Sequence, residues 1–104
     1  MNHRGWLRGE LEAEGYSRIY VSAVASATRD TRLKAATGSS TRAADRVKRA
    51  ELNGRIFAYT DVALMALRQS HDIGGEEAER TVKSHVKQWA EATEEDERWM
   101  AERA

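Results

Sequence analysis

The stretch RIFAYTDVALMALRQS, residues 55–70, decides the fold. Coiled as a helix it is apolar on nearly every side, and its large side chains include Ile56, Phe57, Leu64 and Leu67. A helix of this kind is normally covered by its neighbours. The stretch therefore predicts a buried helix in an all-α fold, and we expect Leu64 and Leu67 to be buried.

A strand is the alternative for part of the same stretch. The run from Arg55 to Tyr59 is rich in β-branched and aromatic residues, and so is the run RIYV from Arg18 to Val21. Short apolar runs of this composition suit a strand as well as a helix. A two-stranded ribbon of residues 18–24 and 55–59, flanked by helices, therefore stays open beside the all-α fold that we favour.

Glycine divides the rest of the chain, which contains no proline. A glycine just past a helix supplies the left-handed conformation that ends many helices. The glycines at 15, 38, 54 and 74–75 then separate helical segments at 3–14, 17–36, 41–53, 55–70 and 76–92. Polar residues suited to helix N-caps follow at Ser17, Ser40, Asp61 and Thr93.

These segments predict one domain over residues 1–104, built as a compact bundle of about five short-to-medium helices. Residues 94–104 form an acidic C-terminal segment, and chain ends often fray. Within this segment Trp99 and Met100 stand among acidic side chains. We expect the pair to dock back onto the bundle, and the alternative is that it binds another chain or a second copy.

A basic segment precedes the apolar stretch. Eight basic and three acidic residues lie between Arg29 and Arg55. If residues 41–53 are helical, Arg42, Arg46 and Arg49 share one stripe. The stripe region, residues 42–55, also contains Lys48 and ends at Arg55.

The helix that carries this stripe has a second, thin stripe of Ala43, Val47 and Ala50, which we expect to be its packing face. The arginines would then project together from the other side, and we expect them to be exposed. They can bind an external acidic partner, pack on Glu94–Glu97 of the same chain, or simply face solvent, with Asp45 pairing with Arg49. All three interpretations stay open.

No catalytic or metal-binding pattern appears in the sequence. There is no cysteine, and the three histidines, His3, His71 and His85, have no metal-ligand spacing. Serines lack the nucleophile motif, and the carboxylates stand in charge runs rather than beside apolar residues. We therefore expect no enzyme, no cofactor and no metal.

The function class follows by elimination. The formal net charge is zero and no apolar run is long enough for a membrane span, so we expect a soluble, cytoplasmic protein without membrane contact. We predict a small protein-interaction module: an adaptor, an assembly subunit or an inhibitor whose partner is a protein with an acidic surface. Its candidate binding residues are Arg42, Arg46, Lys48, Arg49, Arg55, Trp99 and Met100. The alternative is a binder of nucleic-acid backbones that uses the basic residues of 42–55.

Overall fold

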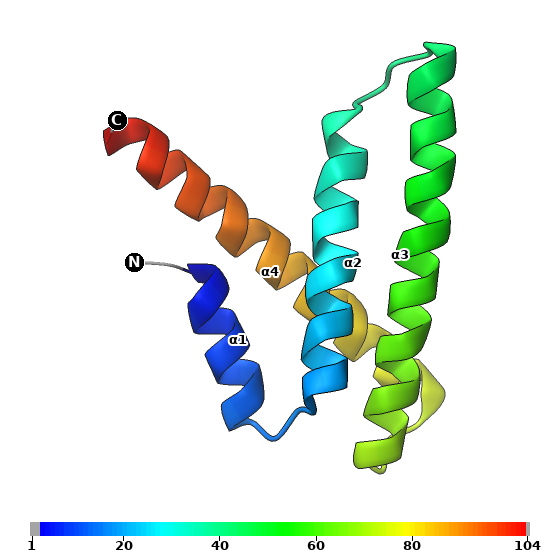
Figure 1. Cartoon of the computed structure of the whole chain (residues 1–104). Helices are drawn as coiled ribbons and strands as arrows, with labels where there is room; N and C mark the ends of the chain where they lie inside the picture. Colours follow the sequence, from blue (N-terminus) through cyan, green and yellow to red (C-terminus); the bar gives the residue numbers. More distant parts are fainter. Residues whose placement is uncertain (1–2, 104) are drawn as a thin grey trace.

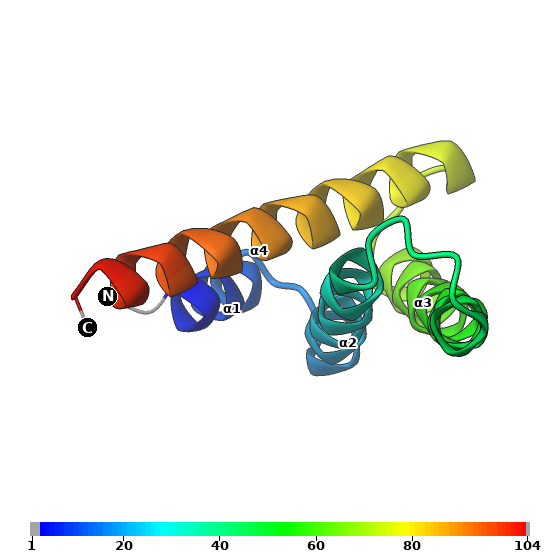
Figure 2. The same cartoon turned by 90° about the horizontal axis from the view of Figure 1, so that it is seen from above.

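Four α-helices in two layers make up the part of the chain that the computed structural model describes, which is residues 3–103 for the backbone and 8–103 for the side chains. They are α1 (His3–Ala13), α2 (Arg18–Ala36), α3 (Ala43–Ser70) and α4 (Gly75–Arg103). In Figure 1 α2 and α3 run antiparallel side by side, and α1 lies on the other side of α2. Figure 2 shows α4 as a layer of its own, which crosses and contacts all three of the others.

The all-α prediction is confirmed, and residues 3–103 contain no strand. Residues 18–24 and 55–59, for which the sequence also allows a ribbon, lie inside α2 and α3. The number of helices is slightly lower than predicted, because two of the expected boundaries fall inside continuous helices.

Both missed boundaries have a local explanation. A Cβ added at Gly54 would meet nothing within 4 Å, so this glycine sits on an open face of α3, where it costs the helix only about 1 kcal/mol relative to alanine. Asp61 likewise lies inside α3 and caps nothing. Thr93 does not cap a new helix either, because its hydroxyl donates to the carbonyl of Trp89, 2.8 Å away, and α4 continues through it.

Two glycines do end helices as predicted. Gly15 and Gly38 have φ of 93° and 59°, a region that side chains disfavour. After α1 the amide of Tyr16 donates to the carbonyl of Leu11 at 3.1 Å, which satisfies an otherwise free carbonyl at the helix end. Ser17 is also confirmed as the N-cap of α2, since its hydroxyl accepts the amide of Tyr20 at 3.2 Å.

The core lies mainly where α4 crosses α2 and the C-terminal half of α3. Small residues on the facing sides let the helices approach closely. The largest members come from all four helices, and the cluster consists of Leu11, Tyr20, Val21, Ala23, Val24, Ala63, Ala66, Leu67, Ala78, Val82 and Trp89. Leu67 is buried as predicted, whereas Leu64 is only partly buried against this cluster.

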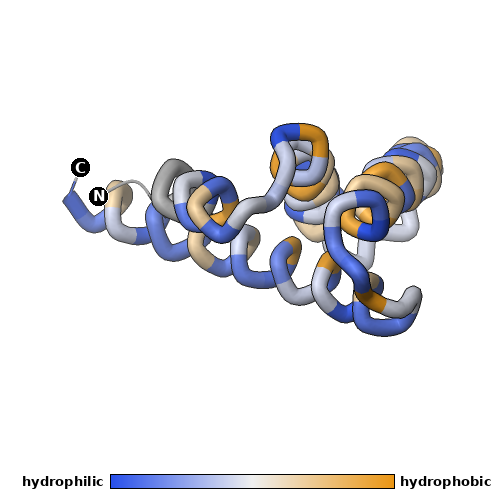
Figure 3. Tube along the Cα trace, turned by 90° about the horizontal axis from the view of Figure 1, so that it is seen from below, coloured by the Kyte–Doolittle hydropathy of each residue, from blue (hydrophilic) through white to orange (hydrophobic). Residues whose placement is uncertain are grey.

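The molecule is flat and exposes much surface. It measures 43 × 36 × 18 Å with a radius of gyration of 14.9 Å, against about 13 Å for a typical domain of this length. In Figure 3 the tube of α4 is mostly hydrophilic, whereas apolar and polar positions alternate along α2 and α3. Among the described residues no helix is both long and apolar enough to cross a membrane.

Candidate interaction surface

The first half of α3 packs on α2 through its polar edge. Leu52 is buried on this side, and Asp45 and Arg49 are half-buried there. The stripe that we expected to pack, Ala43, Val47 and Ala50, is exposed instead. That prediction is wrong, and polar contacts between α2, α3 and their connection explain the orientation of the helix.

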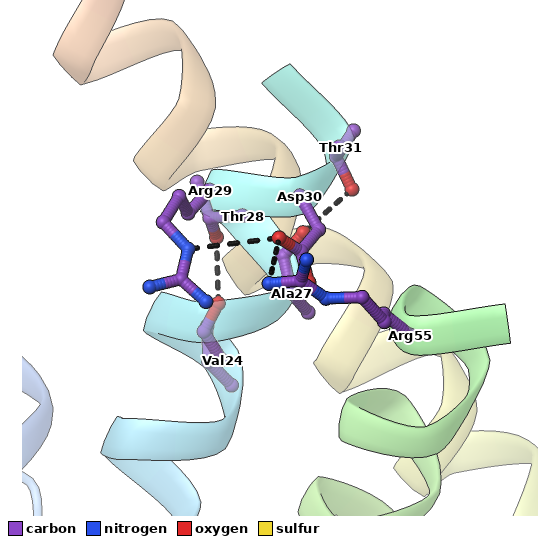
Figure 4. Close-up of polar contacts among 7 residues, drawn as sticks. All are labelled: Val24, Ala27, Thr28, Arg29, Asp30, Thr31 and Arg55. Carbon is purple, nitrogen blue, oxygen red and sulfur yellow. Dashed lines mark hydrogen bonds and ion pairs between the residues drawn. The ribbon is translucent and has the colours of Figure 1, made fainter. Parts of the chain in front are cut away.

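The first of these contacts joins the middle of α2 to α3 (Figure 4). Asp30 of α2 is fully buried, and its Oδ1 lies 3.1 Å from Nη2 of Arg55 and 3.6 Å from Nε of Arg29. Neither carboxylate oxygen accepts a hydrogen bond of good geometry within the described residues. The two guanidinium charges therefore offset the cost of burying this carboxylate, and Arg55 must face α2 to do so.

The second set of contacts fixes the N-terminal end of α3. Arg49 donates through Nη2 to the carbonyl of Ser40 at 2.6 Å and through Nη1 to Oγ1 of Thr37 at 3.4 Å. Ser40 does not cap the helix as predicted; the N-cap is Arg42, and the Ser40 hydroxyl donates to Oδ2 of Asp45 at 2.7 Å. Asp45 thus accepts a hydrogen bond from Ser40 and does not pair with Arg49. The side chains of Asp45 and Arg49 each bind the connection between α2 and α3.

The consequence is an apolar surface on the side of α3 that faces away from α2. We call it the outer face of α3. Phe57 is 74% exposed, Val47 59% and Met65 58%. The same face includes exposed small residues, and its full set is Ala43, Val47, Ala50, Gly54, Phe57, Ala58 and Met65. Figure 2 shows no helix beside the first half of this face, whereas its C-terminal end, at Met65, borders the first turns of α4.

The predicted basic residues separate in space. Arg42, Arg46 and Lys48 are exposed and form no ion pair within the described chain. Arg49 is half-buried, so the prediction that it shares one exposed face with Arg42 and Arg46 is wrong. Positions two apart on a helix point about 160° away from each other, so Lys48 and Arg46 face different sides. Arg42 and Arg46 remain beside the outer face of α3.

The acidic run Glu94–Glu97 contacts α2. Arg32 of α2 forms an ion pair with Glu97 and donates a hydrogen bond to it. None of the bases at 42–55 forms a described ion pair with Glu94–Glu97. The interpretation in which the stripe packs on this run therefore receives no support.

Trp99 and Met100 lie on the last turns of α4 and are exposed. The prediction that they dock back onto the bundle is wrong. Because α4 runs as one helix to Arg103, the segment cannot fold back, and the Trp99 ring instead faces the Arg103 guanidinium, 4.3 Å from the ring centre. The structure does not bring this pair together with the outer face of α3.

An aromatic cluster that the sequence did not predict lies where α2 begins and α3 ends, and α4 crosses it. Tyr16 stacks on Tyr20 and on His71, with ring centres 4.9 and 5.1 Å apart, and meets His85 edge-on at 5.1 Å. The Tyr20 hydroxyl lies 2.6 Å from Nδ1 of His85. His71 and His85 are far from Tyr16 in sequence, so only the α3–α4 turn and the α4 crossing bring them together.

Burial shifts the pKa values of Tyr16, Tyr20 and His85. It raises the pKa of Tyr20 well above its usual value, so the phenol stays protonated while its hydroxyl shares a hydrogen bond with Nδ1 of His85. The pKa of Tyr16 is raised by burial and by the charge of Glu14. Burial lowers the pKa of His85, and the Glu14 carboxylate opposes part of this shift. The lowered pKa favours a neutral His85 at neutral pH, which suits a structural role.

The described residues contain no group of three or more side chains arranged to hold a metal ion. The side chain of His3 lies outside the described part of the chain. Comparison with protein-family models, with curated proteins and with solved structures found no match for this chain.

Proposed function

We propose that this protein is a small, non-enzymatic protein-interaction module, used as an adaptor, an assembly subunit or an inhibitor. Its binding surface in this proposal is the outer face of α3. One observation carries it: Phe57, Val47 and Met65 are exposed on a face that the helix does not use for its own packing. Contiguous apolar patches with a polar rim mark interaction sites.

The chemistry of the surface indicates what would bind it. Phe57 is the largest and most exposed of its apolar side chains, and aromatic anchors contribute much of the free energy of many interfaces. Arg42 and Arg46 flank the same face and form no ion pair with the described side chains. We expect a partner with an apolar ridge and neighbouring carboxylates.

Nucleic-acid binding has less support. A surface that binds nucleic acid needs several basic side chains pointing at one phosphate backbone. Here Arg49 and Arg55 form contacts within the fold, and Lys48 faces another side of α3. Of the basic side chains predicted to act together, only Arg42 and Arg46 are left on one side of α3 to contact phosphates.

Photo-crosslinking can test the proposal in the cells that make this protein. A photoreactive phenylalanine analogue at position 57 should form adducts with protein, because that side chain is expected to sit at the centre of the interface. The matched control is the same analogue at position 95, which is also an exposed helical site. Adducts with nucleic acid at position 57 would replace the proposal by its alternative. Equal yields at both positions, or none at position 57, would overturn it.

A further inference from the structure

The spacing of the outer face of α3 is that of a helix-pairing seam. Ala43, Val47, Ala50, Gly54 and Phe57 follow one another at alternating steps of four and three residues. This alternation is the heptad repeat by which two helices pair along their length. The seam stays open in the described structure, since the Gly54 position faces empty space.

We propose that the partner on this face is a second copy of the same chain, with the two α3 helices paired antiparallel about a two-fold axis. This inference rests on the proposed function and names the partner for the same surface. A two-fold interface uses one patch twice, so the patch must complement itself. The size and the charge pattern of the seam both meet this requirement.

Size complementarity centres on the middle of the seam. If the axis passes near Leu52–Gly54, Phe57 of each copy lies level with Val47 and Ala50 of the other. The small side chains of Ala50 and Gly54 then face each other across the axis. Large residues thus meet small ones, as interdigitated helix packing needs.

Charge complementarity selects the antiparallel direction. Asp61 follows Phe57 by four residues on the same face, and it is exposed without an ion pair in the described chain. Antiparallel pairing brings Asp61 of one copy to the N-terminal end of the other α3, beside Arg42 and Arg46. Helix N-termini also favour negative charge. Parallel pairing would instead place Arg46 beside Arg46 and Asp61 beside Asp61.

The chain as a whole exposes more surface than a monomer of its mass usually does, so it has surface to spare for an interface. The chain exposes 7134 Å², whereas monomeric proteins of 11.7 kDa expose about 5,900 Å². The excess of about 1,200 Å² exceeds the roughly 800 Å² that each partner contributes to an interface of standard size.

The purified full-length chain tests the inference by its mass in solution. Sedimentation equilibrium over a range of concentrations should show a monomer–dimer equilibrium. Phe57→Glu should raise the dissociation constant about tenfold or more, because it buries a charge at the centre of the seam. Arg80→Glu, an exposed reversal on α4, is the matched control and should change little. A monomer at every concentration would overturn the inference.

Charge exchange tests the direction of pairing. Arg46→Glu and Asp61→Arg should each weaken the dimer, and the double variant should restore it, because each copy then carries the exchanged pair. Additive weakening in the double variant would contradict the antiparallel arrangement.

Cross-linking gives a second readout, because the chain has no cysteine. Gly54→Cys should link to itself with a short bismaleimide, and Ala43→Cys should not, since antiparallel pairing holds its two copies far apart. The reverse pattern would contradict the inference. A monomer in solution that still forms protein adducts at position 57 in cells would reject self-pairing and leave the proposed function standing. A monomer in solution that also forms no protein adducts at position 57 would reject self-pairing and the proposed function together.

Discussion

Arg55 of α3 places its Nη2 3.1 Å from Oδ1 of Asp30, a carboxylate that α2 buries completely. The pair orients α3, because turning its apolar stripe toward α2 would carry Arg55 away and leave this charge with Arg29 alone. A buried charge that loses its partner is costly. The exposed outer face of α3 follows from this requirement.

We predict that Arg55→Ala destabilises the protein by about 1–3 kcal/mol, the cost of leaving a buried polar group unsatisfied. Lys48→Ala is the matched control, since Lys48 is exposed, forms no ion pair within the described residues and lies away from the outer face of α3, and it should stay within about 0.5 kcal/mol. Urea unfolding measures both. A cycle with Asp30→Ala should give a coupling energy of about 0.5–3 kcal/mol. Equal effects of Arg55→Ala and Lys48→Ala would mean that the ion pair of Arg55 with Asp30 does not orient α3.

The core can be tested with two leucines on the same helix. Leu67→Ala should cost about 2–5 kcal/mol, because Leu67 is buried among residues of α2 and α4. Leu64→Ala should cost less, since Leu64 is only partly buried. Thermal or urea unfolding of the two variants checks the order, and a larger loss at Leu64 would contradict the packing described above.

The aromatic cluster predicts a pH dependence. In the folded protein the pKa of His85 lies below its ordinary value of 6.5, so the unfolded chain binds the extra proton first as the pH falls. The contribution of His85 to stability is therefore fully present above about pH 6.5. It declines as the pH falls below this value, until the pH has passed the pKa of His85 in the folded protein.

His85→Gln should be less stable than the parent at neutral pH and should lose less stability on acidification. The measurement is the urea midpoint of both proteins near neutral pH and near pH 5, the lower end of the range in which histidine changes charge. The Gln variant keeps a polar side chain at position 85. Parallel loss of stability in the two proteins would show that other groups cause the pH dependence.

Much of the fold could be predicted from local sequence signals. The absence of proline, the glycines at 15 and 38 and the cap at Ser17 act within a few residues, and each behaves as expected. The helix boundary predicted at Gly54 is wrong, because a glycine can also lie inside a helix at a position where nothing contacts it. The N-cap predicted at Thr93 is wrong, because a threonine hydroxyl can also donate to a carbonyl of its own helix.

The candidate site was harder to predict, because long-range polar contacts determine it. Apolar periodicity indicates that Ala43, Val47 and Ala50 should face inward, and a sequence alone cannot show that Asp30 is buried opposite Arg55. The same limit applies to the cluster of Tyr16, Tyr20, His71 and His85. No sequence pattern relates Tyr16 and Tyr20 to His71 and His85, which are more than 50 positions further along the chain.

The central claim is that the outer face of α3 serves binding and not the fold. Its most direct test is the free energy of unfolding of Phe57→Ser and Leu52→Ser, measured by tryptophan fluorescence at the lowest workable concentration, where self-association contributes least. Leu52 is 2% exposed and faces α2, so its replacement should cost about 2–5 kcal/mol. Phe57→Ser should change the stability by no more than about 0.5 kcal/mol. A loss at Phe57 as large as that at Leu52 would mean that this face is covered within the single chain, and the claim would fail.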